Sequence, residues 1–321
     1  MAASESLHQH DHKTVANLQA LIKLQYPARR LPLTDYQMVN SLMVGRHRSR
    51  ARGRGMDFEE LRHYRVGDDI RQMDWKVTNR TRKPHVRIYS EERERPVILV
   101  VDQRAGMFFG SRRMMKSVVA AEMAALLAWH VVDRGDRVGM LVFNDQHSTE
   151  VRPANRQSQI LQILNRLCDY GDKLKRSVTA EQRPALASLD DNGNRLNPML
   201  AKVRKLVGHD ALIHLVSDLE GANDETGQRL SQLMQHNNVV IDFIHDPLEQ
   251  ALPQQGNLAL SDGRFQVELD AADQDLQQKY SRDFAARMNR IQSFLKTRNI
   301  PVLPLTTAQP LESQLFQMLG V

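Results

Sequence analysis

Five largely aliphatic runs after Pro96 constrain the fold of this chain more than any other feature. The runs occupy residues 97–101, 137–143, 212–216, 239–244 and 302–305. Segments with a helical spacing of apolar residues alternate with them, at residues 113–133, 157–168, 196–206, 225–236, 275–298 and 311–319. Strands buried on both faces have continuous apolar sequences, and parallel strands are joined by helices. The sequence therefore predicts an α/β domain with a doubly wound, mostly parallel sheet over residues 96–321.

Two shorter segments modify this domain. Apolar residues at 258–260 and 265–267 flank a Ser-Asp-Gly-Arg turn, which predicts an edge hairpin near residues 257–269. Residues 173–194 are polar and have no periodicity, so we expect a mobile loop there.

The N-terminal third is expected to form two further parts. Residues 1–40 are interpreted as a polar tail and a short helix near residues 15–24, which Pro27 and Pro32 would stop. Residues 41–95 are interpreted as a small, basic, β-rich module. Within it, residues 75–77 and 85–89 flank a turn-like stretch and are predicted to form a hairpin.

The positive charge of the chain is concentrated in this module. Residues 46–95 hold fifteen Lys or Arg residues and nine acidic residues, which accounts for the whole formal net charge of +6. Five arginines alternate with other residues in a basic arm: Arg46, Arg48, Arg50, Arg52 and Arg54. Such an arm attracts nucleic acid, acidic lipid or an acidic protein face, or is simply a solvated segment. No aromatic residue lies within it to stack on bases.

Cysteine content and hydropathy limit the cellular setting. The single cysteine, Cys168, excludes a disulfide framework, a zinc ribbon and a CxxC redox site. The longest apolar stretch, residues 118–132, contains Glu122 and His130 and is shorter than the roughly 20 residues of a membrane span. The N-terminus lacks the pattern of a secretory signal. We therefore expect a cytoplasmic protein with no membrane span.

Acidic residues follow the predicted strands at the sheet edge where doubly wound domains bind ligands. Asp102 ends the first strand and Asp218 follows the third. No GxGxxG or GxxxxGK[ST] loop follows the first strand, which argues against nucleotide binding by those motifs. Two carboxylates at neighbouring strand ends suggest a hard cation such as Mg²⁺, or else two caps on helix N-termini.

One short run carries a specific resemblance. Eight residues fit the pattern R-x-Y-x-x-G-D-D-x-R-x-x-D-W: Arg62, Tyr64, Gly67, Asp68, Asp69, Arg71, Asp74 and Trp75. This run closely resembles the signature of the bacterial family catalogued as domain of unknown function number 58. The Asp-x-x-x-Gly-Met turn after the first strand and the later Leu-Val-Ser-Asp resemble a von Willebrand factor type A domain. The resemblance covers about residues 45–321.

The resemblance implies a role in protein binding. Members of the family are generally found alongside MoxR-type AAA+ ATPases and are thought to act as their adaptors or co-chaperones in maturing other proteins. No enzymatic activity is implied. We therefore expect a non-enzymatic adaptor or assembly cofactor, with the ATPase and a client protein as partners. The alternative is nucleic-acid binding through the basic arm.

The resemblance also implies a metal-ion-dependent adhesion site of the form D-x-S-x-S. The chain keeps Asp102 and Asp218, but Arg104 and Gly106 replace the two serines and Asn194 stands where a Thr is expected. The loss of hydroxyl ligands and the added positive charge disfavour Mg²⁺, so no cofactor is expected. One hypothesis is that Arg104 replaces the metal and bridges the two acids, so that serines at 104 and 106 restore stabilisation by Mg²⁺. The alternative is that Arg104 points to solvent while the acids cap helices.

For the signature module, three roles remain open. In the structural role, its acids tie the turn backbone, Gly67 supplies a permissive φ angle, Arg71 pairs with the carboxylates, and Trp75 anchors the module to the sheet domain. The second role is a partner-docking surface. The third is a metal hydrolase site using Asp68, Asp69 and Asp74.

Overall fold

The computed structural model describes residues 13–30, 56–65, 68–91, 96–179, 195–252, 257–261, 266–270, 273–298 and 300–319. It divides the chain into two compact units, one of residues 1–44 and 95–321 and the other of residues 45–94. The basic arm, Gly67 and Asn194 lie outside the described residues.

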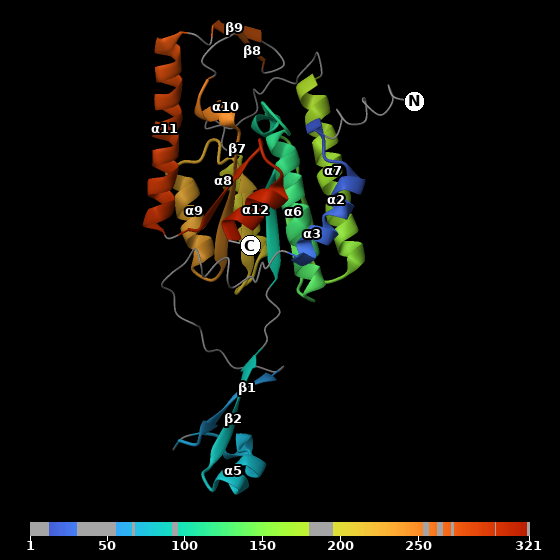
Figure 1. Ribbon diagram of the computed structural model, residues 1–321, viewed down its shortest axis with the longest axis vertical. Helices are drawn as coiled ribbons and strands as arrows, with labels where there is room; N and C mark the ends of the chain where they lie inside the picture. The colour runs from blue at the N-terminus through green and yellow to red at the C-terminus, as the bar shows by residue number, and fades with distance from the viewer. Residues whose placement is uncertain are drawn as a thin grey trace. The chain divides into compact units, whose positions relative to one another are not determined.

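A six-stranded sheet forms the centre of the larger unit (Figure 1). Its strands are β3 (Val97–Asp102), β4 (Val138–Phe143), β5 (Ser148–Ala154), β6 (Leu212–Ser217), β7 (Asn238–His245) and β10 (Val302–Thr306). Their order is β10-β7-β6-β3-β4-β5, and every neighbouring pair is parallel except β4 and β5. The chain builds outward from β3 to β5 and then returns beside β3 to build the other half. This arrangement confirms the predicted doubly wound, mostly parallel sheet.

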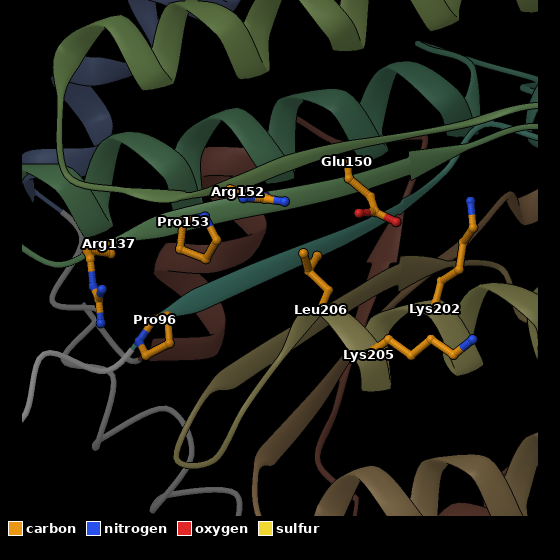
Figure 2. A pocket seen from close by; sticks show the side chains of 8 residues that line it. All are labelled: Pro96, Arg137, Glu150, Arg152, Pro153, Lys202, Lys205 and Leu206. Atoms are coloured by element: carbon orange, nitrogen blue, oxygen red, sulfur yellow. The ribbon is translucent and has the colours of Figure 1, made fainter.

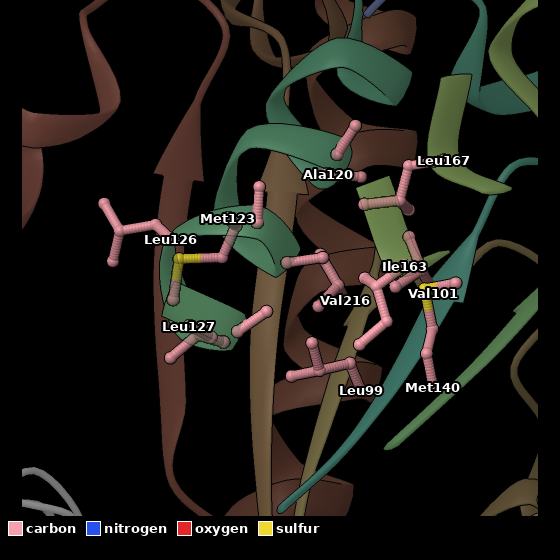
Figure 3. Packing of buried hydrophobic residues seen from close by; sticks show 14 of the residues in the cluster. Leu99, Val101, Ala120, Met123, Leu126, Leu127, Met140, Ile163, Leu167 and Val216 are labelled. Atoms are coloured by element: carbon pink, nitrogen blue, oxygen red, sulfur yellow. The ribbon is translucent and has the colours of Figure 1, made fainter. Parts of the chain in front are cut away.

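Helices cover both faces of the sheet and enclose two apolar cores. On one face lie α6 (Lys116–Asp133), α7 (Gln157–Thr179) and α12 (Leu311–Leu319), and Figure 3 shows Met123 and Ile163 from α6 and α7 packing against Val101 and Val216. On the other face, α8 (Leu196–Leu206), α9 (Asp224–Met234) and α11 (Gln274–Thr297) enclose a second core. The alternating side chains of the central strands β3, β4, β6 and β7 supply both cores.

In the six-stranded sheet, sequence reading missed β5. Only Val151 is fully buried in it, because β5 is one of the two edge strands and runs antiparallel to β4. Such a strand lacks the continuous apolar sequence of a central strand. The predicted loop is also partly wrong, since α7 continues to Thr179; the rest of that loop lies outside the described residues.

The N-terminal helical segment belongs to the larger unit. The predicted short helix is present as α2 (Leu18–Lys23), but Pro27 does not end the helical segment, because a second helix, α3 (Gln25–Arg30), contains it. Pro27 lies in the first turn of α3, where a backbone N–H has no partner within the helix. The Trp129 indole of α6 donates to the Leu21 carbonyl at 3.1 Å, and Leu21 is buried against α6.

The smaller unit contains an antiparallel pair, β1 (Met56–His63) and β2 (His85–Glu91), a 3₁₀ turn at Ile70–Gln72 and α5 (Trp75–Thr81). The predicted hairpin is therefore wrong, because residues 75–77 begin a helix and β2 pairs with β1. Asp74 decides this local outcome, since its side chain caps the helix by accepting from the Val77 amide at 3.0 Å.

The predicted hairpin near residues 257–269 is present as β8 (Asn257–Ser261) and β9 (Gln266–Asp270). The two strands form a sheet of their own and do not extend the six-stranded sheet. Among the described residues, every helix is too short or too polar to cross a membrane.

One partly buried carboxyl on α6 gives a pH-dependent prediction. Burial raises the pKa of Glu122 to about 7 from the ordinary 4.5; Arg113 opposes this rise and Glu312 adds to it. Because the pKa is higher in the folded state, ionisation of Glu122 destabilises the fold as pH rises from 4.5 through 7. Glu122→Gln is therefore expected to raise the free energy of unfolding by about 1–3 kcal/mol near pH 8. Urea unfolding should show almost no gain near pH 4, and an equal gain at both pH values would contradict this explanation.

Candidate functional site

The candidate site lies at the carboxyl ends of β3 and β6. Asp102 is the last residue of β3, and Asp218 directly follows β6. The two strands are parallel neighbours with Val101 opposite Val216, which brings the two acids to the same edge of the sheet. Both are buried: Asp102 is 0% exposed and Asp218 is 2% exposed. Two buried carboxylates need positive partners or several hydrogen bonds.

Arg104 provides the first positive partner. Its Nε lies 3.0 Å from Oδ1 of Asp102, and its Nη2 lies 2.6 Å from Oδ2. The same Nη2 is 3.9 Å from Oδ1 of Asp218, and Nη1 donates to the Glu220 carbonyl at 3.1 Å. Arg104 is thus bidentate to one acid and makes a looser contact with the other, with 7% of the residue exposed. Burial alone would lower the pKa of Arg104, but Asp102, Asp218 and Glu220 raise it.

Lys116 provides the second positive partner, and sequence reading missed it. It is the first residue of α6 and is only 2% exposed. Its Nζ lies 2.7 Å from Oδ2 of Asp218 and 2.7 Å from Oε1 of Glu249. Burial lowers the pKa of Lys116, but the two carboxylates outweigh it and raise the pKa. Nothing in the local sequence distinguishes this lysine from one at an exposed helix start.

The two acids also bind backbone amides. Asp102 accepts from the Arg104 amide at 3.0 Å, and Asp218 accepts from the Glu220 amide at 3.0 Å. The Ser217 hydroxyl donates to Oδ2 of Asp102 at 2.7 Å. The carboxylates therefore hold the turns as well as the cations. The alternative in which Arg104 points to solvent is wrong, because only 7% of this residue is exposed.

A second carboxylate cluster adjoins the first. Asp246 follows β7, is 0% exposed, and caps the short helix α10 (Pro247–Gln250). It accepts from the Ser111 amide at 2.8 Å, from the Ser111 hydroxyl at 2.5 Å and from the Thr307 hydroxyl. Burial opposes ionisation, but these hydrogen bonds hold the pKa of Asp246 below its ordinary value. Glu249 of the same helix binds Lys116, so one network connects the ends of β3, β6, β7 and β10.

Gly106 lies against Glu220. A Cβ atom added at this glycine would come within 2.0 Å of Oε2 of Glu220 and 3.8 Å of Oδ2 of Asp218. A serine at position 106 therefore requires the exposed Glu220 side chain to move. Among the described residues, no group of three or more His, Cys, Asp or Glu side chains is arranged to hold a metal ion.

The signature acids of the smaller unit hold its backbone. Asp68 accepts from Nη2 of Arg62 at 2.9 Å and from the Arg65 amide at 2.7 Å. The Arg65 amide and Arg62 together lower the pKa of Asp68. Asp69 caps the 3₁₀ turn by accepting from the Arg71 amide at 3.0 Å. Within the described part of the chain, Arg62 makes the ion pair that was expected of Arg71.

Other signature residues have different surroundings. The Tyr64 amide donates to the Pro84 carbonyl at 2.8 Å, and Asp74 is 7% exposed. In contrast, Trp75 is 66% exposed and nearby Ile70 is 59% exposed. Trp75 is therefore not part of a core within its own unit.

The chain resembles proteins of known sequence and of known structure. It is 29% identical over 286 residues to the uncharacterised proteins Mb1516 of Mycobacterium bovis and Rv1480 of Mycobacterium tuberculosis, covering 89% of this chain and 85% of each relative. Among solved structures it is similar to BatB, a conserved hypothetical protein from Bacteroides thetaiotaomicron, with 11% identity, a TM-score of 0.37 and coverage of 71% of this chain and 100% of that chain. It is also similar to the SpRpn10 VWA domain, with 10% identity, a TM-score of 0.32 and coverage of 70% and 95%.

The family comparison agrees with the signature run. The family model described as protein of unknown function DUF58 matches residues 60–290, which include the signature from Arg62 to Trp75 and both acids of the sheet edge. The chain therefore belongs to the DUF58 family.

Proposed function

We propose that this protein is a non-enzymatic adaptor that works with a MoxR-type AAA+ ATPase on a client protein in the cytoplasm. The observation that carries the proposal is the ion-pair network of Arg104 and Lys116 with Asp102 and Asp218. Doubly wound domains bind small ligands at this sheet edge. Here Arg104 and Lys116 already neutralise the acids, so a small charged ligand is not needed to hold the strand ends together. A sheet edge that is ordered without a ligand is better suited to contact a protein partner.

In this proposal the site is a degenerate metal-ion-dependent adhesion site. A divalent ion such as Mg²⁺ needs oxygen ligands in a nearly octahedral arrangement. Asp102 and Asp218 already accept from Arg104 and Lys116 at 2.6 and 2.7 Å, and the two positive charges would repel a further cation. The carboxylates of this site, held by Arg104 and Lys116, do not fit a resident metal ion, so we assign no cofactor.

The smaller unit supports the proposal independently. Hydrogen bonds of Asp69 and Asp74 hold the 3₁₀ turn and α5. Ile70 and Trp75, at the starts of these two elements, remain more than half exposed. Tryptophan is enriched among the residues that dominate binding at protein interfaces. We assign Ile70 and Trp75 to the contact with the ATPase.

Affinity capture from the native lysate tests this function. The tagged full-length chain is used with and without a non-hydrolysable ATP analogue, and co-eluting proteins are identified by mass spectrometry. Recovery of an AAA+ ATPase that depends on the nucleotide is expected, and Ile70→Ala with Trp75→Ala should reduce it about tenfold or more. The matched control is Tyr26→Ala, which removes a 63% exposed aromatic side chain from the other unit and should leave recovery unchanged.

Two outcomes would contradict the adaptor function. One is the absence of any AAA+ ATPase under both nucleotide conditions. The other is recovery of only nucleic acid and ribosomal proteins, washed away at moderate salt, which would favour the basic arm of residues 46–54 as the binding element.

A further inference from the structure

A groove beside β5 begins at the end of the sheet opposite to the ion-pair network. Pro96 and Arg137 directly precede β3 and β4, and the groove runs from them between β5 and α8 (Figure 2). It has a volume of about 630 Å³, within the roughly 300–1,000 Å³ of many ligand sites. Pro96, at one end of the groove, is separated from Asp102 by about 20 Å along β3, at about 3.3 Å per residue. At the other end, Glu150 pairs with Leu141 of β4 and so lies level with Val100 of β3. The residues that line the groove are all different from those of the ion-pair network.

The groove is predominantly basic. Its charged lining consists of Arg137, Arg152, Lys202 and Lys205 with a single acid, Glu150. Lys202 donates from Nζ to the Ser148 hydroxyl at 2.7 Å and so connects α8 with β5. In the part of the chain that the structure describes, no carboxylate oxygen lies within 4.0 Å of the charged atoms of Arg152, Lys202 or Lys205. Their charge is available to an incoming anionic group.

The rest of the lining is apolar. Pro96, Pro153 and Leu206 contribute to it, and Figure 2 shows them between the basic side chains, with Lys202 and Lys205 on α8 and Arg152 on β5. Among the described residues, the lining has no aromatic side chain on which a base could stack, which is unfavourable for a single-stranded nucleic acid. A ligand in which apolar and acidic groups alternate would match both the apolar and the basic residues of the lining.

Pro153 also restricts how a ligand can bind. It lies in the edge strand β5 and has no N–H to offer to an added strand. Binding must therefore use side chains of the groove more than backbone pairing along β5. We propose that this groove binds an extended acidic segment of a partner protein, with apolar residues over Pro96, Pro153 and Leu206 and carboxylates on Arg152, Lys202 and Lys205.

Fluorescence anisotropy with the full-length chain tests this proposal. The probe is a labelled peptide of alternating Glu and Pro residues, which is extended, acidic and partly apolar. The wild-type chain should bind it, and higher salt should weaken the binding. Arg152→Glu with Lys205→Glu should raise the Kd about tenfold or more, because two attractive contacts become repulsive. Lys279→Glu on α11 is a matched control at an exposed lysine and should not change the Kd.

Three results would overturn the proposal. They are the absence of binding by the wild-type chain, equal binding of a Gln-Pro peptide, and an unchanged Kd in the double variant with a native circular dichroism spectrum. A labelled oligothymidine is the third probe, and tighter binding of it through Arg152 and Lys205 would assign the groove to nucleic acid instead. None of these results depends on recovery of an ATPase, so the groove and the adaptor function can fail separately.

Discussion

Lys116→Met is expected to lower the free energy of unfolding by about 3–5 kcal/mol. The substitution removes a buried ammonium group, so Asp218 and Glu249 lose the hydrogen bonds and the positive charge that it supplies. Asp218 is 2% exposed and Glu249 is also held by the same Nζ at 2.7 Å. Methionine keeps most of the length and apolar volume of the side chain, so the loss reports charge and hydrogen bonding more than a cavity. Urea unfolding near pH 7, followed by circular dichroism, measures the change.

A control and a second variant identify the cause. Lys205→Met changes an exposed lysine and is expected to stay within about 0.5 kcal/mol of the wild type. Asp218→Asn combined with Lys116→Met should lose less stability than the sum of the two single changes, because the uncompensated charge is gone. A loss below about 1 kcal/mol for Lys116→Met would contradict the buried ion pair.

The effect of Lys116 also has a pH dependence of known sign. Burial would raise the pKa of Asp218, but Lys116 and Arg104 outweigh it and hold the pKa below the ordinary 3.8. A carboxyl whose pKa is lower in the folded state stabilises the fold at pH values above its pKa in the unfolded state. This contribution is lost as the pH falls through its pKa in the folded state. The difference between the wild type and Lys116→Met should therefore shrink in strongly acidic solution.

Sequence reasoning located three of the five charged residues Asp102, Arg104, Lys116, Asp218 and Glu249 of this network. Asp102 and Asp218 are predicted because each stands at the end of a central strand with a continuous apolar sequence. Arg104 is predicted from the resemblance to a metal-ion-dependent adhesion site, in which it replaces the first serine. Lys116 and Glu249 come from the first turns of helices that reach the site only through the tertiary fold. Their positions along the chain carry no periodic signal that would connect them.

The errors in the fold have local causes of the same kind. The central strands are predictable because burial on both faces gives them continuous apolar sequences. The bounds of α8 and α12 are predictable because burial on one face gives a helix its regular spacing of apolar residues. The edge strand β5 and the helix α5 do not. In α5, the cap supplied by Asp74 outweighs a short stretch whose alternation resembles a strand, and capping of this kind typically contributes about 1 kcal/mol.

Arg104→Ser combined with Gly106→Ser is expected to destabilise the protein by about 3–5 kcal/mol, since the bidentate partner of the buried Asp102 is removed. From the sequence alone, these serines were expected to restore stabilisation by Mg²⁺. The structure changes that expectation. The ammonium of Lys116 remains 2.7 Å from Asp218, and Glu220 lies where the new side chain at position 106 must go. The double variant should therefore show no increase in melting temperature on addition of Mg²⁺.

A third substitution separates the two explanations of that result. Adding Lys116→Gln removes the remaining positive charge beside Asp218, leaving Asp102, Asp218 and the new hydroxyls as oxygen donors. If the cations of the native protein substitute for a metal ion, Mg²⁺ should raise the melting temperature of this triple variant. An ion present at a hundred times its Kd contributes about 2.7 kcal/mol, which thermal unfolding readily detects. A rise in the wild type would show that Arg104 and Lys116 leave room for the ion, and the substitution hypothesis would then be wrong. A triple variant that folds but does not respond would instead show that the strand ends lack the geometry of a metal site, so that their charges serve only to hold β3, β6 and β7 together.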